Sequence, residues 1–77
     1  MPRTPPQPQS ARVLLALNMK RLRAERGLSQ DALALEAGLD RTFIAHVERL
    51  RRNISLDNIE KIAVALEVPV HELLACD

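Results

Sequence analysis

The 77-residue sequence predicts an all-α domain of about five short helices, for three reasons. Apolar residues recur at three- and four-residue spacing through most of the chain, which is the period of an amphipathic helix. No stretch alternates between apolar and polar residues for long enough to form a strand. Glycines and helix-capping residues divide the pattern into short segments. A chain of this size forms one small domain with a thin core.

The first helix is expected over residues 11–26, with Leu15, Met19 and Leu22 on one face. Gly27 should end it in the left-handed conformation that closes many helices. Residues 1–10 precede it and contain four of the five prolines, so they are expected to form a flexible arm. The folded domain is therefore expected over residues 11–77.

Three further boundaries define the next helices. Ser29 is a good N-cap for a helix over residues 30–37, which Gly38 should end after two turns. Asp40 then caps a third helix, whose inward residues are Phe43, Ile44 and Val47.

Ser55 should cap the fourth helix, and Pro69 can open a last one over about residues 69–75, because proline needs no donor in the first turn. The apolar face expected for the fourth helix consists of Leu56, Ile59, Ile62, Ala63 and Leu66.

The segment from about residue 29 to residue 49 has the spacing of a helix-turn-helix motif, in which a short turn containing glycine joins two helices. Ala34 has to be small because the two helices cross closely there. Gly38 stands where the chain needs positive φ without a Cβ. Leu39, Ile44 and Val47 then hold the second helix against the rest of the domain. Few random sequences satisfy all five positions.

Residues 15–74 resemble the helix-turn-helix domain of the phage-repressor (Cro, or XRE) family of transcriptional regulators. The similar stretches are "RLRAERGLSQDALALEAGL", "FIAHVE" and "LDNIEKIAVALEV". Within this family, "LDRTFIAHVERLRRN" and the chain's size are most similar to the controller proteins of restriction–modification systems. The resemblance implies a compact, five-helix, lambda-repressor-like fold and sequence-specific binding of double-stranded DNA.

Four side chains are expected to contact bases. In helix-turn-helix proteins the second motif helix enters the major groove. Arg41, Thr42 and His46 are expected on its outer face, where arginine can donate two hydrogen bonds to guanine, worth roughly 1–3 kcal/mol of discrimination. The alternative for Arg41 is a solvated side chain of the first turn. For Arg52, the resemblance implies a base contact.

Four further residues are expected to contact the DNA backbone. Gln30 begins the first motif helix, where side chain and amide can meet a phosphate, and the resemblance implies the same role. The resemblance also implies a phosphate contact for Asn53, whereas Arg49 and Arg51 either contact phosphates or are solvated. Residues 1–52 carry ten Lys or Arg against five Asp or Glu, a net charge of +5, so this part of the chain can face a polyanion.

The resemblance also implies a largely covered ion pair between Arg23 and Glu48, with a direct DNA contact of Arg23 as the alternative. Two positions depart from the family pattern: Leu50 stands where glycine is usual, and Ile54 where proline is frequent. Because leucine does not readily adopt positive φ, we expect the third helix to run longer or to end differently.

The C-terminal part is expected to form a homodimer interface, which would let two recognition helices meet a near-palindromic operator about 34 Å apart. RNA polymerase is a further candidate partner, although no residue identifies a patch for it. The alternative is an antitoxin-type protein-interaction module with secondary DNA binding. The interface residues, which the resemblance places on the last helices, are Val64, Val68, Val70, Leu73 and Leu74.

Other functional classes find no support in the sequence. His46, His71 and Cys76 are too far apart in sequence to suggest a metal site, and there is neither a phosphate-binding glycine loop nor a nucleophile with a base at useful spacing. We therefore expect neither an enzyme nor a cofactor. No apolar run is long enough to span a membrane and no signal peptide is present, so a cytoplasmic location is expected.

Overall fold

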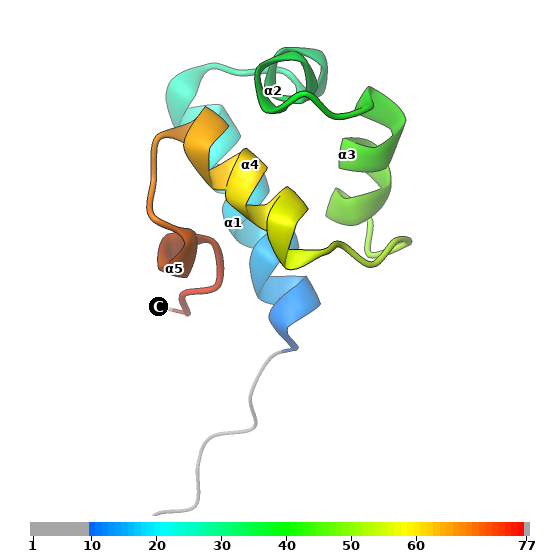
Figure 1. The fold of residues 1–77 in the computed structure, drawn as a ribbon. Coiled ribbons are helices and arrows are strands. Elements are labelled where there is room, and N and C mark those ends of the chain that lie inside the picture. The colour runs from blue at the N-terminus through cyan, green and yellow to red at the C-terminus, as the bar shows by residue number, and fades with distance from the viewer. Residues whose placement is uncertain (1–9, 77) are drawn as a thin grey trace, which may run out of the picture.

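A computed structural model describes residues 10–76, and within this range it contains five helices and no strand. The predicted all-α fold is confirmed (Figure 1). The flexible arm predicted for residues 1–10 lies, apart from Ser10, outside the described residues. None of the helices within the described range is long and apolar enough to cross a membrane. The helices are α1 Ala11–Arg26, α2 Gln30–Ala37, α3 Arg41–Glu48, α4 Leu56–Leu66 and α5 Val70–Leu73.

The first four helices begin at a side chain that accepts a hydrogen bond from the backbone of the first turn. Ser29 accepts from Ala32 at 3.0 Å, and Asp40 accepts from Thr42 at 3.0 Å. Ser10 and Ser55 cap α1 and α4 in the same way. Each cap satisfies one of the N–H groups that a helix start leaves without a partner. The predicted N-caps are therefore confirmed.

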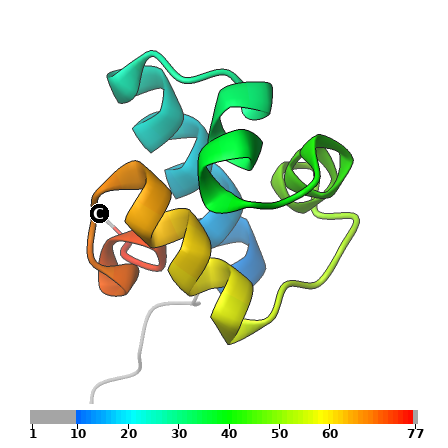
Figure 2. The same ribbon diagram turned by 45° about the horizontal axis from the view of Figure 1, so that its top comes forward.

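All five helices contribute buried residues to one core, in which α2 packs against α3 and α4, α1 packs against α3, and α5 packs against α1 and α4 (Figures 1 and 2). Leu56 was expected to be buried in it, and this prediction is wrong, since 73% of Leu56 is exposed. Leu56 is the first residue of α4 and follows an exposed loop, so the neighbouring helices do not reach it. The largest fully buried side chains are Leu15, Met19, Leu33, Ile44, Ile62, Leu66 and Leu73.

The last helix, α5, is shorter than expected, and Pro69 flanks it instead of occupying its first turn. The buried side chain of Asn18 on α1 contacts the end of this helix. Its Nδ2 donates to the carbonyl oxygens of Leu73 and Ala75, at 2.9 Å each. Asn18 therefore satisfies carbonyls at the end of α5 and ties the C-terminal segment to α1.

Each of the helices α1 to α4 is followed by a residue in the left-handed conformation, and the N–H of the next residue bonds back to the last turn. After α1 and α2 the left-handed residue is Gly27, with φ 67°, and Gly38, with φ 70°. After α3 and α4 it is Leu50, with φ 64°, and Glu67, with φ 60°. After α3 the left-handed residue comes one position later, because the C-cap Arg49 has φ −96°. The backward bonds measure 2.8–3.0 Å and join Leu28 to Arg23, Leu39 to Ala34, Arg51 to His46 and Val68 to Ala63.

The expectation that Leu50 would avoid positive φ is wrong. Its N–H donates to Val47 at 3.1 Å and the N–H of Arg51 donates to His46 at 2.8 Å, so two carbonyls of α3 are satisfied. Ile54, further along the loop, packs against the core and anchors its far end. These contacts offset a backbone conformation that costs about 1–2 kcal/mol in a residue with a Cβ.

The helix ends predict stability changes of opposite sign. Leu50→Gly should raise the free energy of unfolding by roughly 0.5–1 kcal/mol, because the relief at positive φ exceeds the added entropy of the unfolded chain. Gly38→Ala should lower it by about 1 kcal/mol. A Cβ at Gly38 would meet no atom within 4 Å, so only its backbone conformation is tested. Urea denaturation measures both changes, and equal signs would contradict this explanation.

Candidate nucleic-acid interface

The amphipathic helix α3 packs against α1 and α2 and stands at one side of the molecule (Figure 2). On the inner face of α3, Ile44 and Val47 are buried, and Phe43 is half-buried at the edge of this face. Arg41 and Thr42 are exposed in its first turn, as expected, whereas His46, one turn further on, is half-buried. The structure thus presents the N-terminal end of α3 to solvent, with His46 less accessible than the other two.

A buried ion pair holds α3 against α1. The carboxylate of Glu48, whose side chain is 2% exposed, accepts from Arg23 through both of its oxygens. The distances are 2.8 Å from Nε to Oε2 and 2.8 Å from Nη2 to Oε1. The remaining terminal nitrogen of Arg23 donates to the carbonyl oxygen of Leu28 at 2.9 Å. The ion pair expected from the family pattern is therefore present, and Arg23 serves the fold through it.

The hydrogen bonds of the pair favour the charged form of Arg23. The hydrogen bonds to Glu48 raise the pKa of the Arg23 guanidinium above its ordinary value, and the charge of Glu48 acts in the same direction. Partial burial of Arg23 lowers its pKa but is outweighed. Each oxygen of Glu48 has a donor, so no part of this charge is left without a hydrogen bond. Removing one partner would strand the other.

Gln30 belongs to the same network, which the sequence analysis missed. Its side-chain Nε2 donates to Oε1 of Glu48 at 3.0 Å, and the residue is half-buried. The structure therefore directs the Gln30 amide toward a buried carboxylate, and its contact with a phosphate stays a prediction. Gln30, Arg23 and Glu48 come from three different helices, so this network fixes α1, α2 and α3 relative to one another.

Arg41 has a partner that the sequence analysis did not foresee. Its Nε lies 3.1 Å from Oδ1 of Asp31, which is in the first turn of α2. Both side chains remain largely exposed, at 63% for Arg41 and 74% for Asp31. The signal that could have indicated this pair is the presence of opposite charges in the first turns of the two motif helices.

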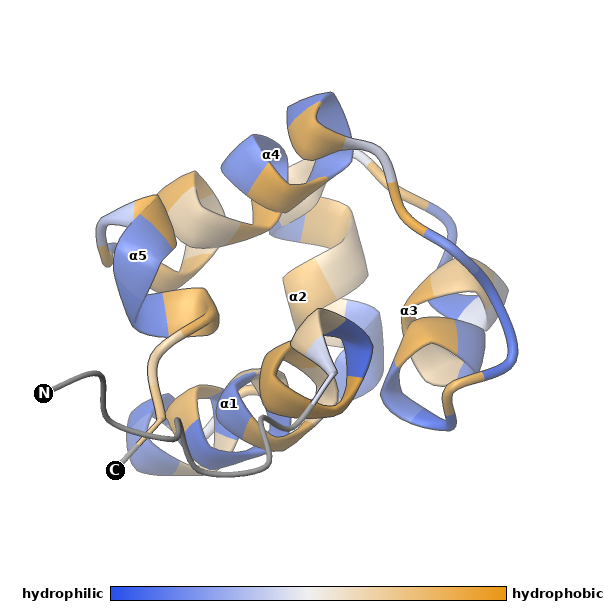
Figure 3. Cartoon of the chain, turned by 90° about the horizontal axis from the view of Figure 1, so that it is seen from below, coloured by the Kyte–Doolittle hydropathy of each residue, from blue (hydrophilic) through white to orange (hydrophobic). Residues whose placement is uncertain are grey.

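The loop between α3 and α4 brings Arg52 back to α3. The guanidinium carbon of Arg52 lies 5.7 Å from the centre of the Phe43 ring, in a cation–π arrangement. Arg49, Arg51 and Asn53 are exposed along the same loop. Figure 3 shows this loop as a largely hydrophilic ribbon at the outer edge of the molecule. The loop therefore adds basic and polar side chains beside α3.

The predicted dimer surface is only partly available. Leu73 was expected there, and this is wrong, because Leu73 is 0% exposed and belongs to the core of the single chain. It is buried because α5 packs against α1, where Asn18 holds the carbonyl of Leu73. Val68, Val70 and Leu74 are half-buried against the same core, whereas Val64 on α4 is 76% exposed.

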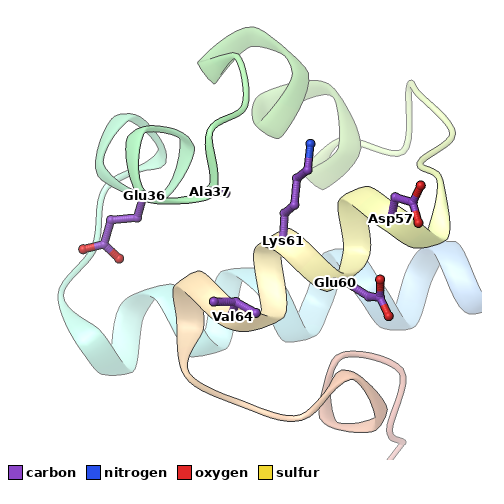
Figure 4. A pocket seen from close by; sticks show the side chains of 6 residues that line it. All are labelled: Glu36, Ala37, Asp57, Glu60, Lys61 and Val64. Atoms are coloured by element: carbon purple, nitrogen blue, oxygen red, sulfur yellow. The ribbon is translucent and has the colours of Figure 1, made fainter.

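A groove of about 480 Å³ lies between the C-terminal end of α2 and the outer face of α4 (Figure 4). Three carboxylates and a single basic side chain line it, so its charge is unfavourable for a phosphate. The residues expected to contact bases are not among those that line it. The lining residues are Glu36, Ala37, Asp57, Glu60, Lys61 and Val64.

Comparison with known proteins places this arrangement among transcriptional regulators. A family model described as Helix-turn-helix matches residues 19–73. A hypothetical transcription factor of Neisseria meningitidis serogroup B is 49% identical over 74 residues, which cover 96% of this chain and 70% of that protein. The crystal structure of the restriction–modification controller protein C.AhdI from Aeromonas hydrophila has a TM-score of 0.78 and 45% identity, covering 80% of this chain and 94% of that chain.

A third neighbour is the controller protein C.Esp1396I, whose structure contains a 25 base pair operator site. It has a TM-score of 0.77 and 33% identity, and the match covers 87% of this chain and 92% of that chain. All three similarities extend over most of the folded region described above, including α2 and α3.

The buried pair predicts a large loss when one partner is removed alone. Arg23→Ala should lower the free energy of unfolding by roughly 3–5 kcal/mol, because the carboxylate of Glu48 would remain buried without its main donor. Replacing both residues, as in Arg23→Met with Glu48→Leu, should leave stability within about 1 kcal/mol of the parent or raise it. Urea denaturation of the three proteins checks this. A loss of less than about 1 kcal/mol for Arg23→Ala would show that Glu48 is not stranded.

Proposed function

Because this chain belongs to the XRE-type helix-turn-helix family of transcriptional regulators, we propose that it binds a specific double-stranded DNA site and regulates transcription there. The observation that carries this proposal is the exposed first turn of α3 on a helix clamped by Arg23 and Glu48. The operator bound by the related C.Esp1396I supports it. We propose no enzymatic activity and no cofactor.

The dimensions of α3 suit the major groove. An α-helix with its side chains is about 10–12 Å across, and the major groove is about 12 Å wide, so the eight-residue α3 can lie in it. Arg41 and Thr42 lie at the end of this helix that enters first in helix-turn-helix complexes. Arg41 would donate to guanine O6 and N7, and Thr42 would offer its hydroxyl or its methyl group. His46 and Arg52 would reach other bases further along the same groove.

Backbone contacts would come from residues around α3. We propose that Arg49, Arg51 and Asn53 in the loop after α3 meet phosphates on one side, and that Gln30 at the start of α2 meets them on the other. These contacts fix the position of the protein on the duplex without reading its sequence. Each neutralised phosphate releases counterions, so the affinity would fall as salt rises.

We further propose that the protein acts as a homodimer on a near-palindromic operator. A single eight-residue recognition helix reads few base pairs, and two copies related by a twofold axis double the contacts. The similarity to C.AhdI supports a role in controlling restriction–modification genes, with RNA polymerase as a further partner if the protein activates them.

Selection of bound sequences from random duplex DNA tests the DNA-binding proposal. The wild-type protein should enrich a near-palindromic motif, whereas Arg41→Ala should lose most of its preference for that motif over a random duplex. The reason is that the lost contacts, worth roughly 1–3 kcal/mol per guanine, exist only on the correct sequence. Titrations of both duplexes at one salt concentration measure the two affinities. Equal losses on both duplexes would refute base reading by Arg41.

The dimer proposal predicts a species of twice 8.6 kDa in sedimentation equilibrium at tens of micromolar protein. Val64→Asp should shift this species toward the monomer, because a charge would enter an apolar contact. Leu35→Asp is the matched control, since Leu35 is 83% exposed, similar to Val64 at 76%, but lies on α2 and is not among the residues expected at the interface. Sedimentation that shows only 8.6 kDa particles would contradict the dimer.

A further inference from the structure

We propose that Asp31 is a positioning residue, whose carboxylate holds the Nε of Arg41 so that the two terminal nitrogens face a guanine. This inference rests on the proposed function, because it concerns how Arg41 reads DNA. Asp31 itself need not contact DNA.

The fold fixes the relative position of the two residues. Asp31 is the second residue of α2, and Arg41 is the first residue of α3. The turn between these helices is fixed by Gly38 at φ 70° and by the bond from Leu39 to Ala34 at 2.9 Å. The carboxylate is also well placed near the N-terminus of α2, where the helix dipole favours negative charge. Asp31 therefore offers its acceptor at a defined place beside α3.

The arginine side chain has several donor nitrogens, and the carboxylate of Asp31 lies beside one of them, Nε. A guanidinium has five N–H groups, and the ion pair brings Oδ1 within 3.1 Å of Nε, the nitrogen that carries one of them. The four N–H groups on Nη1 and Nη2 are not needed for that contact. Guanine presents two adjacent acceptors, O6 and N7, which match the two terminal nitrogens of arginine. Asp31 can thus orient Arg41 without using the edge that reads the base.

The charge of Asp31 supports the same interpretation. A carboxylate beside a surface that approaches phosphates opposes DNA binding of any sequence. An exposed ion pair adds little to stability. It can still affect recognition, because a side chain already held in its bound orientation loses less freedom when it binds. The pair therefore weakens binding to random DNA and favours the duplex that supplies a guanine opposite Arg41.

Glu36 provides a matched control on the same helix. It lies in the groove between α2 and α4 and points away from α3 (Figure 4). Asp31→Asn and Glu36→Gln each remove one negative charge from α2 without a large change in size. Any general electrostatic gain in DNA affinity should appear in both variants. A loss of discrimination should appear only in Asp31→Asn.

The experiment compares affinities for the duplex selected by the wild-type protein and for a random duplex of equal length at one salt concentration. Asp31→Asn should lower the ratio of the two affinities about three- to fivefold, which is near the upper end of what an exposed ion pair can contribute and a part of what a bidentate guanine contact provides. Selection with this variant should also return a relaxed base preference at one position of each half-site. Glu36→Gln should leave the ratio unchanged, and Asp31→Glu should restore part of it.

A double variant tests whether Asp31 acts through Arg41. The ratio for Asp31→Asn combined with Arg41→Ala should equal that for Arg41→Ala alone. An Asp31→Asn ratio within twofold of wild type, or a further drop in the double variant, would overturn the inference. If the wild-type protein selects no motif, the proposed function fails and this inference fails with it. If it selects a motif that depends on Arg41 but not on Asp31, only the inference fails.

Discussion

The ion pair between Arg23 and Glu48 is the contact on which the rest of the molecule depends. It joins α1 to α3 in the part of a small core where apolar area is limited, and Gln30 extends it to α2. Apolar side chains alone determine roughly which face of α3 is buried. They leave the exact rotation of the helix about its axis, and its distance from α1, less restricted. Directed bonds of 2.8 Å to both oxygens of one carboxylate fix these values. The exposed residues of α3 are placed by this restriction.

Features that depend on neighbouring residues in the chain could be predicted from the sequence. The caps Ser29, Asp40 and Ser55 and the left-handed glycines follow from local backbone chemistry, and the structure agrees with them. The wrong predictions involve contacts that are distant in sequence. Leu50 adopts positive φ because the loop it begins is anchored by Ile54 in the core. Periodicity could not show that Leu73 would be covered by α1, since this depends on how a short helix folds back.

The candidate site also contains features that could be predicted from the sequence and features that could not. The exposure of Arg41 and Thr42 could be predicted because the apolar period of α3 determines its outer face. Their partners could not, because Asp31 and Arg41, or Phe43 and Arg52, meet only when helix crossing angles and side-chain rotamers are known. The family pattern indicated the partner of Arg23 but not the third member of that network, Gln30.

The position of Gln30 has a consequence for the geometry of a complex. A primary amide nitrogen carries two hydrogens, and one of them serves Glu48. If the other hydrogen bonds to a DNA backbone, the position of that backbone relative to the domain is set by the buried carboxylate of Glu48, through Gln30. The packing inside the domain would then determine the distance between the sugar–phosphate chain and the recognition helix. A change in internal packing would therefore change how deeply that helix lies in the groove between the two strands.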